Sequence, residues 1–206
     1  MKTIVALSYF NRKIGPLVFF SYPKNSLDKG LSVKIANIMD QQYSEGFFTH
    51  SFENLKSINY YFEINSKWAR GYKEMLMVSI ILDQQISPEI EESMSALCKR
   101  FSEKMKSEQD IFTGFYINDL KQYEEDKDRV LRNESLIKKM VQDLYWETLE
   151  ETKKKSEEED KDRVLRNELE IENEKVIPYC KHCGAELPKG QTICHICGNS
   201  FYNYNY

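Results

Sequence analysis

The stretch that decides the fold is Thr3–Tyr22, which reads TIVALSYFNRKIGPLVFFSY. Two runs rich in β-forming residues, 3–10 and 17–22, are separated by a connector that contains Gly and Pro and is typical of a hairpin turn. Both runs are almost continuously apolar, which favours central strands covered by helices on at least one face. Pro23 is expected to end the second strand.

The periodicity changes after this hairpin. Apolar residues recur at helical spacing over 28–43, which predicts an amphipathic helix. The runs 47–55, 58–64 and 75–82 are typical of strands. Ser87, followed by Pro and Glu, indicates the start of a second helix. The order β-β-α-β-β-β-α predicts an α+β domain with a five-stranded antiparallel sheet flanked by helices.

Two smaller features complete this part of the chain. The aromatic segment 111–117 fits either a strand or a helical turn. Cys98 falls on the apolar stripe of the second predicted helix, so we interpret it as a small buried residue and not as a reactive thiol.

The beginning of the chain resembles the longin domain. The resemblance is carried by Ala6–Phe10, Ile14–Val18 and Ser21–Pro23, which look like the first hairpin of longin domains in folliculin-type and nitrogen-permease-regulator-type proteins and their archaeal relatives. It covers about residues 1–120. It implies a non-catalytic platform of the kind found in tethering complexes, adaptors, some SNAREs and regulators of small GTPases.

A charged segment, 121–175, follows the predicted longin-like domain, 1–120. It contains an eleven-residue motif, EEDKDRVLRNE, at Glu124–Glu134 that recurs unchanged at Glu158–Glu168. A local duplication that lengthened a charged helix explains this repeat, because two copies without further signature residues do not predict a solenoid.

Only one part of the charged segment is amphipathic. Apolar residues at helical spacing over 130–145 predict packing on the domain or on a partner. The apolar stripe thins beyond Trp146, so 150–162 is interpreted as a solvated helix or a disordered linker, with a coiled coil as the alternative.

The C-terminal part, 176–206, contains two Cys-x-x-Cys-Gly knuckles and an aromatic tail. Two residues between cysteines let both thiolates reach one metal, and the following glycine can take a positive φ and leave its N–H free to donate to sulfur. The pattern predicts one structural Zn²⁺ bound by four cysteines: Cys180, Cys183, Cys194 and Cys197. Iron in the same four thiolates is the alternative metal.

Other interpretations of the knuckles are disfavoured. Disulfides need an oxidising compartment, and a thioredoxin-like motif uses one Cys-x-x-Cys and not two. His182 and His195 are expected to be exposed residues beside the metal ligands. The segment resembles the short C-terminal zinc ribbons of many prokaryotic proteins, which implies an appended interaction module.

Catalytic patterns are missing from the sequence: it has no Gly-rich phosphate loop, Ser/His/Asp set or His-Glu-x-x-His, so an enzyme is not expected. No apolar run reaches about 18 residues, and the start of the chain lacks a cleavable signal pattern, so we expect a cytoplasmic protein without a membrane span. The net charge of −4 gives no general reason to expect nucleic-acid binding.

Trp68, Arg70 and Tyr72 lie between two predicted strands and belong to the residue types enriched at interfaces, so they are the candidate partner-binding residues. The alternative for Trp68 is that it packs back on its own domain. The aromatic tail, Phe201–Tyr206, lacks nearby Arg or Lys for a phosphate and is expected to cover part of the ribbon.

The leading hypothesis is a longin-like adaptor whose partner is a small Ras-like GTPase or another longin or roadblock subunit, met through the sheet edge or the first helix. The alternative is a zinc-ribbon protein associated with nucleic acid or ribosomes, in which the longin-like part forms a homodimer. A third hypothesis makes Arg70 the arginine finger of a GTPase activator.

Overall fold

The computed structural model describes residues 2–41, 44–52, 55–83, 86–175, 179–180, 182–186 and 193–199, with the backbone alone at 41, 156, 158–160 and 162–175. It divides into two compact units, Met1–Lys155 and Ser156–Tyr206. The predicted three-part division at 120 and 175 stays a prediction.

A five-stranded antiparallel sheet forms the centre of the first unit. Its strands are β1 (Thr3–Asn11), β2 (Gly15–Tyr22), β3 (Gly46–Phe52), β4 (Leu55–Asn65) and β5 (Lys73–Leu82). The spatial order is β2-β1-β5-β4-β3, and every neighbouring pair is antiparallel. The α+β prediction is therefore confirmed, but the prediction that both strands of the first hairpin are central is wrong. β2 is an edge strand, and each of its residues keeps some exposure to solvent.

The helices are α1 (Lys29–Asn37), α2 (Pro88–Ser107) and α3 (Lys127–Lys175), with 3₁₀ segments η1 (Ile38–Gln41), η2 (Ile111–Asp119) and η3 (Glu124–Asp126). Both predicted starts are capped: the Asp28 side chain accepts from the Leu31 N–H at 2.8 Å, and the Ser87 hydroxyl accepts from the Ile90 N–H at 3.4 Å. The first helix is shorter than predicted, because it continues as η1. The segment 111–117, left open by the sequence, is 3₁₀ helix.

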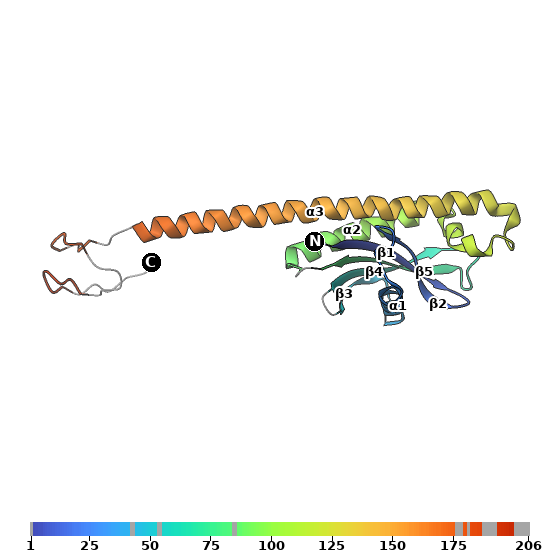
Figure 1. The fold of residues 1–206 in the computed structure, drawn as a ribbon, viewed down its shortest axis with the longest axis horizontal. Coiled ribbons are helices and arrows are strands. Elements are labelled where there is room, and N and C mark those ends of the chain that lie inside the picture. The colour runs from blue at the N-terminus through green and yellow to red at the C-terminus, as the bar shows by residue number, and fades with distance from the viewer. Residues whose placement is uncertain are drawn as a thin grey trace. The chain divides into compact units, whose positions relative to one another are not determined.

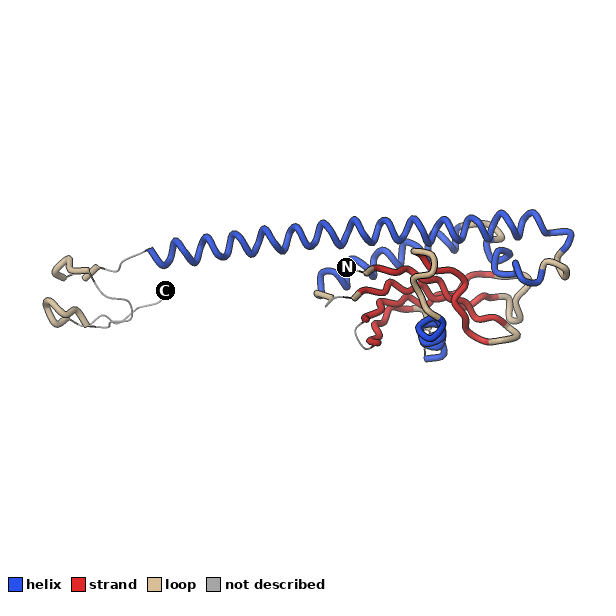
Figure 2. Tube along the Cα trace, viewed as in Figure 1, coloured by secondary structure: helices blue, strands red, loops and turns tan. Residues whose placement is uncertain are grey.

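The sheet has a different helical layer on each face (Figures 1 and 2). Successive residues of a strand point to opposite faces. In β1, Val5 and Leu7 join a core made with α2, η2 and α3, whereas Ile4 and Ala6 join a smaller core made with α1 and η1. This two-sided burial explains why β1 and β5 are almost continuously apolar.

The first half of α3 is anchored on α2 and η2. Its buried residues at helical spacing confirm the predicted amphipathic stretch: Val130, Ile137, Met140, Val141 and Leu144. Asn133, which is 3% exposed, donates to the Asp110 carbonyl at 2.8 Å and to the Thr113 hydroxyl at 2.9 Å. The first copy of the duplicated motif therefore holds the start of α3 in place.

None of the helices within the described ranges is both long and apolar enough to cross a bilayer.

Replacing Gly114 with Ala is expected to lower the free energy of unfolding by about 1–3 kcal/mol, the usual range for an overpacked core. An added Cβ at this position would lie 2.7 Å from the Glu134 backbone nitrogen and 2.7 Å from Cδ1 of Ile137. Urea unfolding measures the change.

Gly30→Ala in α1 is the matched control. There the Cβ meets only the Asp28 carboxylate oxygen, at 3.3 Å, and alanine favours a helix. Equal losses of stability in the two variants would contradict the close packing of η2 on α3.

Candidate functional site

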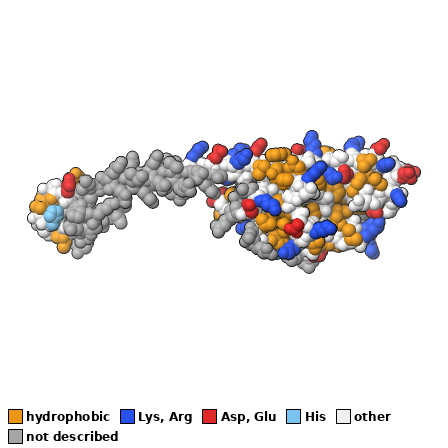
Figure 3. Space-filling view, viewed as in Figure 1, with side chains coloured by type: hydrophobic (Ala, Val, Ile, Leu, Met, Phe, Trp, Pro, Cys, Tyr) orange, Lys and Arg blue, Asp and Glu red, His pale blue; other side chains and the backbone are white. Residues whose placement is uncertain are grey.

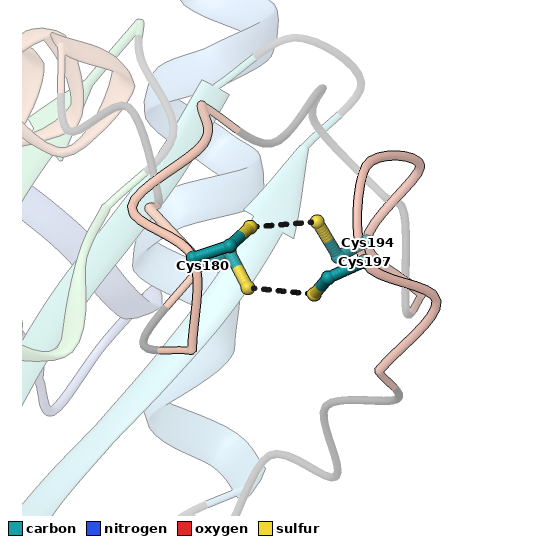
Figure 4. Close-up of side chains that lie close together, drawn as sticks. Cys180, Cys194 and Cys197 are labelled. Atoms are coloured by element: carbon teal, nitrogen blue, oxygen red, sulfur yellow. Dashed lines mark hydrogen bonds between the residues drawn. The ribbon is translucent and has the colours of Figure 1, made fainter.

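The four cysteines of the second unit converge on one point (Figure 4). The Sγ atoms of Cys180 and Cys197 are 3.6 Å apart, as are those of Cys183 and Cys194, and all four lie within 4.8 Å of one another. A tetrahedral ion with metal–sulfur bonds of about 2.3 Å has sulfur–sulfur edges of about 3.8 Å. The cluster is therefore close enough to bind a single metal ion.

The backbone of each knuckle follows the same pattern. Gly184 has φ +75° and Gly198 has φ +72°, which confirms the left-handed conformation expected after each second cysteine. The sequence predicted that the glycine N–H groups are free to donate to sulfur, but the structure gives them other acceptors. They donate to the carbonyl oxygens of Cys180 and Cys194, at 2.7 and 2.8 Å. This bond closes each knuckle and brings its two thiols to the same side.

Other backbone N–H groups face the sulfurs and shift the pKa values of the thiols. The N–H of Cys197, with that of Ile196, lowers the pKa of Cys194 to about 6 against the opposing effect of burial. The N–H of Ala185 lowers the pKa of Cys183, but burial and the neighbouring sulfurs outweigh it and raise that pKa to about 12. The pKa values of Cys180 and Cys194 are thus lowered and those of Cys183 and Cys197 are raised, and a bound cation would favour the thiolate form of all four.

The chemistry of this donor set is that of a closed site. Four thiolates fill a tetrahedral shell and leave no position for a catalytic water. His182 and His195 are exposed, as expected, and the metal-binding group found among the described residues consists of the four cysteines. The aromatic tail, Phe201–Tyr206, lies outside the described residues, so its predicted position over the ribbon is not tested.

The candidate partner-binding residues do not form one surface. Trp68 stacks on Tyr123, with ring centroids 4.0 Å apart, and meets Tyr116 edge to face at 5.2 Å. It packs on its own domain, which is the alternative that the sequence left open. Arg70 is exposed, and Tyr72 is 76% exposed with φ +60°. Partner binding by these two stays a prediction.

A polar residue that the sequence did not single out is buried behind this loop. Glu74 is 6% exposed, and its Oε1 accepts from the Ser66 hydroxyl and the Tyr116 hydroxyl, both at 2.7 Å. Burial raises the pKa of Glu74, and the two hydroxyl bonds and the charge of Arg12 oppose this only in part. No pattern could have revealed it, because a single Glu at the start of a strand is usually solvated.

Cys98 behaves as the sequence predicted. Its side chain is fully buried in the core between α2 and the sheet, and burial raises the pKa of its thiol to about 12. It is a packing residue and not a reactive thiol.

No protein-family model and no curated protein matches the chain.

Cys180→Ser is expected to lower the affinity for Zn²⁺ by on the order of tenfold or more, because even residues that only support a ligand contribute 10- to 100-fold. Wild-type protein purified under reducing conditions should bind one equivalent, measured by elemental analysis and by Co²⁺ absorption in the thiolate charge-transfer region. Cys98→Ser, the control for loss of a thiol, should keep the metal. Full occupancy in Cys180→Ser would contradict the four-cysteine site.

Glu74→Gln is expected to become more stable relative to wild type as the pH rises from about 4 to 8. A carboxyl whose pKa is higher in the folded state binds more protons there, so its contribution to stability is present at low pH and is lost as the pH rises through the folded pKa. Urea unfolding of both proteins across this range measures the difference. A difference that does not change with pH would show that Glu74 titrates normally.

Proposed function

We propose that the protein is a non-catalytic, longin-like adaptor that binds protein partners, and that its partner is a small Ras-like GTPase or another longin or roadblock subunit. The observation that carries the proposal is the sheet. Its five antiparallel strands occur in the element order that the resemblance implies, with one helix on one face and two on the other. The partner class rests on that resemblance, because a fold alone does not determine function.

Two exposed features of the first unit suit a protein partner. β3 is the last strand of the sheet, and no strand in the described part of the chain pairs with its outer edge, which could therefore pair with an added strand. α1 packs through Ile35 and Ala36 and leaves Val33 58% exposed on its outer side. In Figure 3, hydrophobic side chains on the visible face of this unit are interspersed with charged ones, as is common at interfaces that form and dissociate.

The metal-binding module fits a second contact site. Three apolar residues close to the cysteines are largely exposed: Tyr179 at 58%, Ile193 at 56% and Ile196 at 66%. A bound Zn²⁺ would hold these residues in a fixed arrangement, since the module is too small to fold on an apolar core alone. In the proposal, zinc is structural and the ribbon is an accessory interaction module.

Val33→Asp is expected to weaken capture of the partner about tenfold or more, because it places a charge at the outer face of α1 where an apolar contact is proposed. The measurement is a pull-down from lysate of the source cell, read by mass spectrometry and followed by titration with the purified Ras-like GTPase or roadblock subunit. Ile14→Asp, which changes a 75% exposed residue in the β1–β2 turn, is the matched control.

A chain truncated after Glu174 separates the two function hypotheses. If both the truncated and the intact chains retain a Ras-like GTPase or a longin or roadblock subunit, the longin-like unit is the part that binds the partner. If only the intact chain retains partners, and these are nucleic-acid or ribosomal components released steeply by salt, the adaptor proposal is wrong.

A further inference from the structure

A cavity of about 300 Å³ lies at one end of the sheet, where the β1–β2 turn, the β4–β5 loop and η2 meet. Its lining includes Tyr9 at the end of β1 and Arg12 in the β1–β2 turn, Arg70 in the β4–β5 loop and Glu74 at the start of β5, and Phe115 and Tyr116 in η2. Three segments far apart in the sequence thus build one site. Its volume falls at the lower end of the range for small-molecule pockets.

The carboxyl group of Glu74 gives this cavity an unfilled acceptor. Both hydroxyl donors, from Ser66 and Tyr116, bond to Oε1, and no hydrogen bond to Oε2 is formed by any side chain in the described ranges. A carboxyl group with 6% exposure is costly to bury unless its oxygens are hydrogen-bonded or its charge is paired. The charge of Arg12 already acts on Glu74, so what is missing is a hydrogen-bond donor to Oε2, and a ligand with a positively charged N–H group supplies one.

Two cations at the same cavity lack an anionic hydrogen-bond partner among the described residues. Arg12 lies over the ring of Tyr116 at 5.9 Å and donates to the neutral amide oxygen of Gln122 at 3.1 Å. Arg70 is exposed and forms no ion pair within the described part of the chain.

The other charges that line the cavity are already paired. Of the residues that line it, Lys73 bonds through its ammonium group to Glu63, and Asp119 accepts from the ammonium group of Lys13, each at 2.7 Å. The site therefore offers guanidinium groups for a carboxylate next to a carboxyl group for an amine.

We propose that this cavity binds a free α-amino acid, whose ammonium group donates to Oε2 of Glu74 and whose carboxylate is held by Arg12 and Arg70. The aromatic wall, where the rings of Tyr9 and Phe115 lie 5.1 Å apart, takes an apolar side chain. At about 30 Å³ for each water-sized group, the volume holds roughly ten non-hydrogen atoms, which suits an amino acid and is too small for a nucleotide. The site does not depend on the adaptor function.

The test is isothermal titration of the full zinc-loaded chain with L-phenylalanine and L-leucine. Each amino acid is compared with the acid that lacks its amino group and with the amine that lacks its carboxyl group. At least one amino acid is expected to bind, and to bind tenfold or more tightly than either of its analogues. No binding of either amino acid, or equal binding of an analogue, would overturn the proposal.

Variants locate the site. Glu74→Gln and Arg70→Gln are each expected to weaken binding of the amino acid tenfold or more. Arg70 lies on the exposed loop, so its variant keeps the test decisive if Glu74→Gln fails to fold. Lys67→Gln, which removes an exposed charge from the same loop outside the cavity, should bind as wild type does. Unchanged affinity in the Arg70→Gln variant would exclude the assigned pocket.

Discussion

The pairing of β1 with β5 is the constraint on which the first unit depends. These strands lie in the interior of the sheet, with Val5 opposite Ile80 and Leu7 opposite Val78, and helices cover both of their faces. Each buried apolar residue of the pair must therefore suit one of two cores as well as its neighbour in the ladder. α1 seals one face, and α2 and α3 seal the other. The helices hold their positions because the apolar sheet gives each of them a surface to bury.

The second unit follows a different rule. It has little apolar material to bury, and the buried residues found in its described part are Cys180 and Cys194. Local backbone bonds close each knuckle, and the four cysteines lie close enough together to bind one metal ion. One chain thus combines a unit stabilised mainly by apolar burial with one organised around a four-cysteine cluster.

The sequence predicted those features whose physical cause is local. Strands buried on both faces, capped helix starts and cysteines at ligand spacing each leave a pattern within a few residues. The edge position of β2 was missed, because its apolar side chains pack on helices contributed by distant parts of the chain. Trp68 and Glu74 were not assigned for the same reason, since their surroundings come from η2 and from Tyr123, about 40 to 55 residues downstream.

Burial of a single cysteine in the first unit has a practical consequence. Cys98 is fully buried on the inner face of α2, whereas the other four cysteines form the cysteine cluster of the second unit. A thiol-modifying reagent can reach Cys98 only when α2 lifts from the sheet. The rate at which the reagent labels Cys98 therefore measures how often the apolar core opens. Cys98 is thus a built-in probe of that motion, separate from the metal-binding cysteines.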